Sequence, residues 1–209
     1  MIKVILFDLW GVLATKRMRI FDQITEAYGL PDGAHSYFVQ LLEQMELGEL
    51  DEAGFWTRFY TEFNIDPAIP VLPWLTIYEN ITVVDEAVLS LASELRKHNY
   101  KVAILSNTES IAVKHLYNLD IVSKFDIAFF SFELACLKPN EKIYKHVIQQ
   151  LNVQPSEVIF IDDNLKNIRA AESLGIQGIL FHDTSQVKKQ LSELLKIVLT
   201  TSAMPSQAE

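Results

Sequence analysis

The chain has 209 residues, of which 49% are hydrophobic and 22% are charged, a composition typical of a folded globular protein with a sizeable core. Its formal net charge of -9 and sequence pI of about 5.1 exclude the basic surface that general nucleic-acid binding requires. An anionic substrate would therefore need a local positive site, such as a metal ion or a lysine.

The first residues, MIKVILFD, indicate a buried strand rather than a leader peptide. No segment approaches the roughly 18 apolar residues of a membrane helix, so we expect no membrane partner. Cys136 is the single cysteine and cannot form an internal disulfide. We therefore expect a reducing compartment, the cytoplasm.

Five short apolar runs lack polar alternation, which predicts strands buried on both faces of a parallel sheet. They are Ile2–Phe7, Lys101–Leu105, Ile127–Ser131, Val158–Ile161 and Gly178–Phe181. Helical periodicity lies between them, over Asp85–Lys97, Lys142–Leu151 and Asn164–Leu174, and Gly175 is placed to end the last of these helices. Strands that alternate with helices predict βαβ units and an α/β fold.

Residues 16–83 break this alternation. The segment shows no convincing buried strand and predicts helices over about 18–29, 34–47, 51–63 and 72–79. We predict a Rossmann-like α/β core formed by residues 1–15 and 84–198, an inserted α-helical cap over residues 16–83, and a flexible tail over residues 199–209. Five aromatic residues of the insertion are expected to form the core of this cap, namely Phe21, Tyr28, Phe55, Trp56 and Phe59.

Four of the predicted strands end in, or lead into, polar residues of particular types. In chain order these are Asp8, then Ser106 and Asn107, then Lys138, then Asp162 and Asp163. The carboxyl ends of parallel strands meet at one edge of a sheet, where ligands bind. We therefore expect these side chains to converge, and we expect Asn167, further along the chain, to be exposed.

The residue types suit phosphoryl transfer. Asp8, Asp162 and Asp163 offer the hard oxygen ligands that Mg²⁺ requires, and three carboxylates in one crevice repel each other without a cation. Lys138 and the Ser106 hydroxyl would hold phosphoryl oxygens. A carboxylate nucleophile would form an aspartyl phosphate and split the reaction into two steps.

The ordered set of these four strand ends resembles the haloacid dehalogenase superfamily over roughly residues 1–196. The helical insertion stands where subclass I members carry their cap. Three stretches, Ser106-Asn107-Thr108, LKPNEKIY and FIDDN, are most similar to the branch of sugar phosphatases and epoxide-hydrolase N-domains.

This resemblance implies a role for each matching position. Asp8 would be the nucleophile and a Mg²⁺ ligand, and Ser106 and Lys138 would hold the phosphate. Asp163 would bind Mg²⁺ directly, whereas Asp162 would act through water or by orienting its neighbours. The main-chain carbonyl of Trp10 would be a further metal ligand.

Trp10 departs from the family pattern, which usually has an aspartate acid/base two residues after the nucleophile. Indole cannot exchange protons in this way, and losing such a group typically costs ~10²–10⁴-fold in rate. Trp10 would instead line the substrate pocket. Asn107, at the end of the second predicted strand, is a further candidate for substrate binding.

This departure is compatible with four interpretations. The chain is a phosphatase that tolerates the loss, a 2-haloacid dehalogenase, or an impaired pseudo-phosphatase that binds a phosphorylated ligand or partner. The Asp162-Asp163 pair argues for Mg²⁺ and against the dehalogenase. A phosphonate-cleaving enzyme would need a cap lysine, which residues 17–83 lack. We predict a Mg²⁺-dependent phosphatase that acts on a small phosphorylated metabolite.

Overall fold

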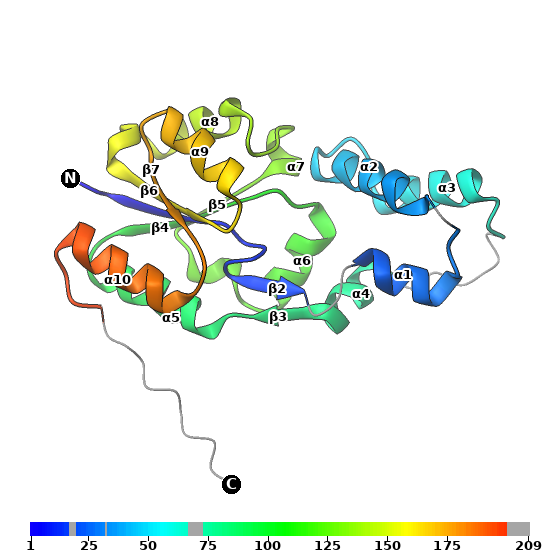
Figure 1. Cartoon of the computed structure of the whole chain (residues 1–209), viewed down its shortest axis with the longest axis horizontal. Coiled ribbons are helices and arrows are strands. Elements are labelled where there is room, and N and C mark those ends of the chain that lie inside the picture. Colours follow the sequence, from blue (N-terminus) through cyan, green and yellow to red (C-terminus); the bar gives the residue numbers. More distant parts are fainter. Residues whose placement is uncertain (17–19, 32, 67–72, 200–209) are drawn as a thin grey trace, which may run out of the picture.

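The computed structural model describes residues 1–16, 20–31, 33–66 and 73–199. Its centre is a five-stranded sheet in the order β5-β4-β1-β6-β7, in which every neighbouring pair is parallel (Figure 1). The strands are β1 Val4–Phe7, β4 Lys101–Ser106, β5 Ile127–Phe130, β6 Val158–Asp162 and β7 Gln177–Leu180. The predicted Rossmann-like α/β core with a parallel sheet is confirmed.

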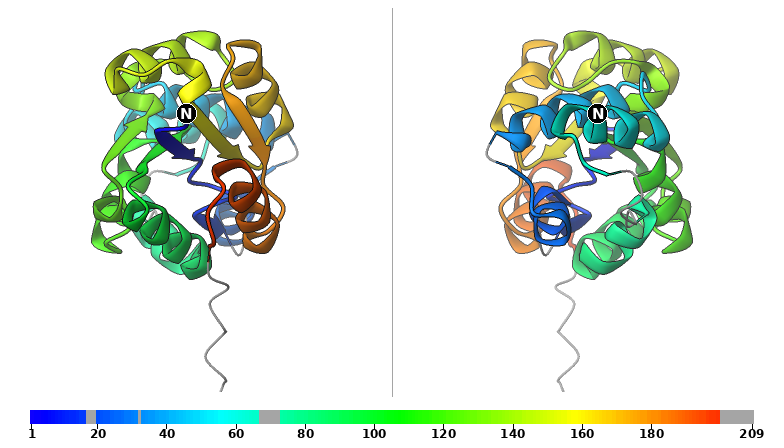
Figure 2. Two further views of the ribbon diagram at one scale, coloured as in Figure 1. Left: turned by 90° about the vertical axis from the view of Figure 1, so that its left-hand side faces the viewer. Right: turned by 90° about the vertical axis from the view of Figure 1, so that its right-hand side faces the viewer.

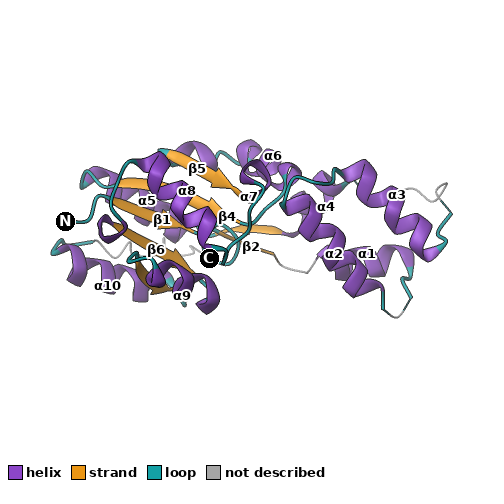
Figure 3. Ribbon diagram, turned by 90° about the horizontal axis from the view of Figure 1, so that it is seen from above, coloured by secondary structure: helices purple, strands orange, loops and turns teal. Residues whose placement is uncertain are grey.

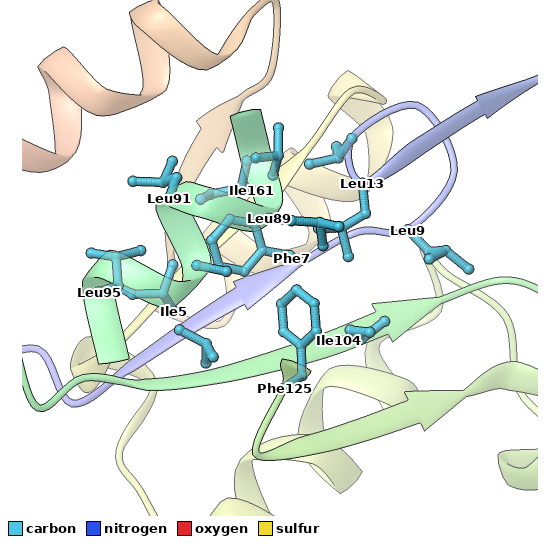
Figure 4. Packing of buried hydrophobic residues seen from close by; sticks show 14 of the residues in the cluster. Ile5, Phe7, Leu9, Leu13, Leu89, Leu91, Leu95, Ile104, Phe125 and Ile161 are labelled. Carbon is cyan, nitrogen blue, oxygen red and sulfur yellow. The ribbon is translucent and has the colours of Figure 1, made fainter. Parts of the chain in front are cut away.

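The central strand β1 supplies both faces of this core. Ile5 and Phe7 face one apolar cluster, whereas Val4 and Leu6 face the other, and all four residues are buried. Figure 4 shows Phe7 among side chains of the first cluster, between Leu89 of a covering helix and the neighbouring strands. A strand buried on both faces must be apolar throughout, which explains the continuous run in the sequence.

Helices cover both faces of the sheet (Figure 2). The first cluster packs against α5 Glu86–Lys97, α6 Ser110–Asn118 and α10 Thr184–Leu195, and the second against α8 Glu141–Leu151 and α9 Leu165–Ser173. Short turns complete the connections, namely α7 Ser131–Leu134, η1 Val122–Lys124 and η2 Pro155–Glu157.

Local signals set the helix ends. Asp85, Asn164 and Asp183 each precede a helix and accept a hydrogen bond from a backbone N–H of its first turn. Gly175 follows α9 with a φ of 87°, a conformation that favours glycine, as the sequence predicts.

Four helices form the insertion and lie beyond the carboxyl ends of the strands (Figure 3). They are α1 Ile20–Tyr28, α2 Ala34–Glu46, α3 Glu52–Phe63 and α4 Trp74–Ile81. Their aromatic residues Phe38, Phe55, Trp56, Phe59 and Trp74 are buried in a third apolar cluster. Of the aromatic residues expected in this core, Phe55, Trp56 and Phe59 are buried and Phe21 is partly buried against it, whereas the Tyr28 side chain lies outside what the structure describes.

Two short strands at the base of the insertion were not predicted from the sequence. β2 Ala14–Lys16 and β3 Thr82–Val84 pair with each other in an antiparallel ribbon. This ribbon stands where the chain passes between the sheet and the helical insertion, and the N–H of Asp85 after β3 donates to the Leu13 carbonyl before β2 at 2.9 Å. It holds residues on both sides of the predicted boundaries at 15/16 and 83/84, which stay predictions.

At the other end, Leu199 is buried in the first cluster although we assigned it to the tail. The rest of the predicted tail, residues 200–209, lies outside the described residues. Among the described helices, none has both the length and the apolar character needed to cross a bilayer.

Replacing Phe7 tests the importance of the first cluster. Phe7 is 0% exposed, so Phe7→Ala should lower the free energy of unfolding by about 3–5 kcal/mol through lost burial and a cavity. Val198 is 83% exposed, and Val198→Ala should change the free energy of unfolding by less than about 0.5 kcal/mol. Urea unfolding measures both, and equal losses would contradict this view of the core.

Candidate active site

The site begins where two paired strands end side by side. Asp8 directly follows β1, and Asp162 is the last residue of β6. The strands are in parallel register, with Phe7 opposite Ile161, and the Asp8 N–H donates to the Ile161 carbonyl at 2.8 Å. Sheet pairing therefore places the two carboxylates next to each other at the carboxyl edge.

A buried ammonium group joins these carboxylates. Lys138 Nζ lies 2.7 Å from Asp8 Oδ1 and 2.7 Å from Asp162 Oδ2, and it donates to the Leu105 carbonyl at 3.0 Å. A lysine has three N–H donors, so all three have an acceptor. A phosphate oxygen that bound Lys138 directly would have to displace one of them.

Asn107 fixes the backbone of Lys138. Its amide nitrogen donates to the Lys138 carbonyl at 2.9 Å, and its Oδ1 accepts from the Lys138 N–H at 2.8 Å. The end of β4 is thereby tied to the loop that carries the lysine. The neighbouring Ser106 is fully buried, and its hydroxyl donates to the Asn107 carbonyl at 3.3 Å. Its predicted role as a phosphate holder stays a prediction.

The Asp162 carboxylate is held on both oxygens. Oδ1 accepts from the Asn164 N–H at 2.7 Å, and the Asn167 side-chain amide donates to both oxygens at 3.1 Å. Asn167 is 6% exposed, so our expectation of an exposed side chain was wrong. Helical side chains tilt toward the N-terminus of their helix, which returns this amide from α9 to the strand end.

Asp163 completes a group of three carboxylates. One oxygen from each of Asp8, Asp162 and Asp163 lies within 4.8 Å of the others, and Asp163 is exposed. A cluster of hard oxygen donors at this spacing fits Mg²⁺. Among the described residues, no N–H donates to the Trp10 carbonyl, so it is also free to act as a ligand.

Gly11 allows the first loop to approach Asp163. Its φ is +91°, and an added Cβ would clash with Oδ2 of Asp163 and lie 2.5 Å from its carboxyl carbon. The turn is closed by the Leu9 carbonyl, which accepts from the N–H groups of Leu13 at 2.8 Å and Ala14 at 2.9 Å. The positive φ and this close approach both favour a glycine where the loop after β1 meets the acidic pair.

The Trp10 side chain forms one wall of the site. Its ring stacks on Tyr78 with centroids 5.6 Å apart, and its Nε1–H donates to Thr108 at 3.3 Å. Lys16 Nζ lies 4.3 Å from the centre of the Trp10 ring and 5.3 Å from that of Tyr78, a cation–π arrangement.

A cavity of about 320 Å³ opens onto these groups. It is lined by Asp8, Trp10, Lys16, Glu46, Asn107, Lys138, Asp163, Asn164 and Asn167. Asp8, Trp10, Asn107, Lys138 and Asp163 were predicted site residues, and the structure brings all five together. Ser106 and Asp162 lie behind this surface, fully buried.

Sequence reasoning missed Lys16, Glu46, Asn164 and Asn167 as cavity residues. For Asn164 and Asn167 a signal existed, since they start the helix that follows the Asp162-Asp163 pair. Lys16 and Glu46 carry no such signal. They reach the site from the ribbon strand β2 and from the last residue of α2.

Electrostatics favour a cation in this site. Burial raises the pKa of Asp8 to about 7, with Lys138 opposing the shift and Asp162 adding to it. Burial alone would lower the pKa of Lys138, but Asp8 and Asp162 raise it above its ordinary value. The pKa of Asp163 is also raised, by partial burial and by Asp162. One ammonium group therefore does not offset three neighbouring carboxylates, and a bound cation would relieve the excess charge.

Comparison with known proteins agrees with this geometry. Residues 2–175 match the family model of haloacid dehalogenase-like hydrolases. The chain belongs to this family.

Its relatives among the haloacid dehalogenase-like hydrolases include two phosphatases. The chain is 25% identical to a sesquiterpene phosphatase of Aspergillus oryzae, over 92% of this chain and 96% of that protein. It is also 25% identical to a phosphorylated carbohydrates phosphatase of Thermotoga maritima, over 84% of this chain and 82% of that protein. A Bacteroides thetaiotaomicron enzyme of the family, solved as a magnesium complex, superposes with a TM-score of 0.75 at 25% identity, over 89% of this chain and 98% of that one.

The close approach at Gly11 can be tested against a matched glycine. Gly11→Ala should displace Asp163 and weaken Mg²⁺ binding by at least about tenfold, roughly 1.4 kcal/mol. Gly29 also has a positive φ, of 60°, but no atom lies within 4 Å of an added Cβ. Gly29→Ala should cost only about 1–2 kcal/mol of stability and leave Mg²⁺ binding unchanged. Calorimetric Mg²⁺ titration of both variants distinguishes a local clash from general strain.

The raised pKa of Asp8 predicts a pH-dependent stability. The folded protein holds this proton more tightly than the unfolded chain, so stability falls as pH rises from about 4 to about 7, then levels. Asp8→Asn removes this loss. In EDTA the variant should melt at a higher temperature than the wild type at pH 8, with a smaller difference at pH 5.

Mg²⁺ should reverse that ranking at pH 8, because only the wild type keeps the full set of ligands and binding stabilises the folded state. Calorimetric melting with EDTA and with Mg²⁺ measures both effects. The prediction would be contradicted if the wild type were more stable than Asp8→Asn in EDTA at pH 8, because the charged Asp8 carboxylate would then not destabilise the folded protein.

Proposed function

We propose that this hydrolase is a Mg²⁺-dependent phosphatase that acts on a small phosphorylated metabolite through an aspartyl phosphate on Asp8. The observation that carries the proposal is the cluster of Asp8, Asp162 and Asp163, whose oxygens lie within 4.8 Å, beside the buried ammonium of Lys138. The two phosphatase relatives and the magnesium-bound structural neighbour support it.

The Asp8 carboxylate has one oxygen free for attack. Oδ1 accepts from Lys138 and from the Leu9 N–H at 2.6 Å, while Oδ2 receives no hydrogen bond from the described residues. Lys138 and the Leu9 N–H therefore orient the carboxylate and leave Oδ2 to attack phosphorus. The P–O bond to the leaving group breaks as the aspartyl phosphate forms.

The remaining residues would bind Mg²⁺ or neutralise the charge of the phosphoryl group. Asp8, Asp163 and the Trp10 carbonyl would hold Mg²⁺, and Asp162, already held on both oxygens, would orient Lys138 instead of binding the metal directly. A bound Mg²⁺ would neutralise charge on the phosphoryl oxygens. Lys138 supplies a second positive charge, and Asn107 keeps that lysine in place.

Trp10 and the helical insertion would shape the substrate pocket. The indole ring stacks on Tyr78 of α4, and Trp10 is one of the residues that line the cavity. We propose that the insertion over residues 16–83 acts as a cap that limits substrate size and excludes water. A cytoplasmic location is part of the same proposal and rests on the single Cys136.

A phosphate-release panel tests this function. Asp8→Asn should lower turnover by at least about 10³-fold, because an amide cannot form the aspartyl phosphate. EDTA should abolish turnover, and Mg²⁺ should restore it. Lys3→Met is the control. Lys3 pairs with Glu157 at the amino ends of β1 and β6, opposite to the site, so its replacement should leave turnover unchanged.

Two outcomes would contradict the proposal. Tight binding of phosphorylated ligands with no phosphate release on any substrate would favour the pseudo-phosphatase. Metal-independent halide release from a 2-haloacid would indicate the dehalogenase.

A further inference from the structure

The cavity beside Asp8 contains a carboxylate that the proposed function does not yet use. Its titratable lining residues are Asp8, Lys16, Glu46, Lys138 and Asp163. Four come from the sheet edge, its loops or the ribbon. Glu46 is the exception, since it is the last residue of α2 and reaches the cavity from the helical insertion.

The other four groups are already engaged. Asp8 and Asp163 belong to the carboxylate cluster, and the Lys138 ammonium has an acceptor for each of its three N–H groups. Lys16 lies over the rings of Trp10 and Tyr78. Among the described residues, no hydrogen bond or ion pair holds the Glu46 carboxyl group, so it can exchange a proton with a ligand.

The backbone of Glu46 is fixed to the sheet. The hydroxyl of Ser131, the residue directly after β5, donates to the Glu46 carbonyl at 2.7 Å. The same hydroxyl accepts from the Thr108 N–H at 2.9 Å, in the loop after β4. The end of α2 is therefore held against two strand ends of the active site, and its position does not depend on the insertion alone.

The surroundings of Glu46 keep its proton available near neutral pH. Burial raises the pKa of Glu46 to about 7, and Glu109 at the start of α6 and Glu43 one turn earlier in α2 add to the shift. Lys16 from β2 and Lys138 from the loop after β5 oppose it. An acid/base works best when its pKa lies near the working pH.

We propose that Glu46 is the catalytic acid and base of this site, in place of the aspartate that Trp10 displaces. This inference rests on the proposed phosphatase function. As Asp8 attacks phosphorus, the bond to the ester oxygen breaks, and that oxygen takes the proton of Glu46 and leaves as the alcohol. Glu46, now a carboxylate, accepts a proton from the water that attacks the aspartyl phosphate. The bond between phosphorus and Asp8 breaks, phosphate leaves, and Glu46 is protonated again.

The leaving group separates this role from a structural one. Nitrophenolate leaves p-nitrophenyl phosphate without needing a proton, whereas the alkoxide of hexyl phosphate must be protonated. Glu46→Gln should lower kcat/KM on hexyl phosphate by about 10²-fold or more. On p-nitrophenyl phosphate, Glu46→Gln should still form the aspartyl phosphate at close to the wild-type rate. The hydrolysis of that aspartyl phosphate should slow, because no base activates the attacking water. The variant should therefore release a burst of nitrophenolate equal to the enzyme concentration, while the phosphoenzyme accumulates.

The chain offers a matched control in Glu49→Gln, which removes an exposed carboxyl three residues after Glu46 that does not line the cavity. It should keep the wild-type rates on both substrates. Glu46→Asp should recover part of the rate on hexyl phosphate. In the wild type at saturating Mg²⁺, alcohol release in a single turnover should fall as pH rises above about 7, and this limb should be absent in Glu46→Gln.

Several results would overturn the inference while leaving the proposed function intact. These are wild-type rates in Glu46→Gln on hexyl phosphate, equal losses on both substrates without a burst, or a wild type that cleaves only p-nitrophenyl phosphate. A leaving-group-dependent loss in Lys16→Met instead would assign the proton to Lys16. A wild type that releases no phosphate from either probe with Mg²⁺ would overturn the proposed function and this inference together.

Discussion

The arrangement of the site depends on one buried ammonium group between two carboxylates. Lys138 is 4% exposed and lies 2.7 Å from both Asp8 and Asp162. A buried charge is costly unless it is paired and hydrogen-bonded, so the three groups must be placed together or not at all. The contact joins β1 and β6 to the loop after β5, and Asn107 adds the end of β4. Four strand ends are thus tied by side-chain chemistry as well as by the sheet.

The same contact leaves a charge imbalance. Asp8 and Asp162 share one ammonium group, and Asp163 adds a third carboxylate at the exposed side of the cluster. The apolar core below the cluster brings no charge, and Lys16, the other lysine that lines the cavity, lies over the rings of Trp10 and Tyr78. This imbalance supports the proposal that a cation completes the site, and a phosphate group would then bind to positive charge on an otherwise acidic protein.

The parts of the fold that could be predicted from the sequence are the strands that are buried on both faces of the sheet. The sheet strands are largely apolar runs, and four of them, β1, β4, β5 and β6, end in a polar residue or are followed directly by one. The convergence of Asp8 and Asp162 at one edge of the sheet could therefore be predicted, whereas the pairing of β1 with β6 comes from the structure. The ribbon strands β2 and β3 could not be found in this way. Each has only three residues, and β3 is partly exposed throughout, so neither has an apolar pattern.

The missed site residues share a different physical reason. Asn167 lies five positions after Asp162, and only the direction of a helical side chain returns it to the strand end. Glu46 lies far from every motif in the sequence. Its position depends on how α2 packs on Ser131, a contact between residues 85 positions apart that no local pattern encodes.

Trp10 shows why a missing acid need not mean a missing reaction. Its indole packs on Tyr78 of the insertion and lies beneath Lys16, so it contributes to the contact between the insertion and the sheet. An aspartate there would place a fourth carboxylate beside Asp8, Asp162 and Asp163. A large apolar ring instead keeps charge away from the floor of the site and orders its wall. An inserted helix that ends at the cavity can supply a carboxylate that is not part of the cluster of Asp8, Asp162 and Asp163 and whose pKa is raised by burial. In such an arrangement the sheet edge provides attack and charge neutralisation, and the insertion provides the proton.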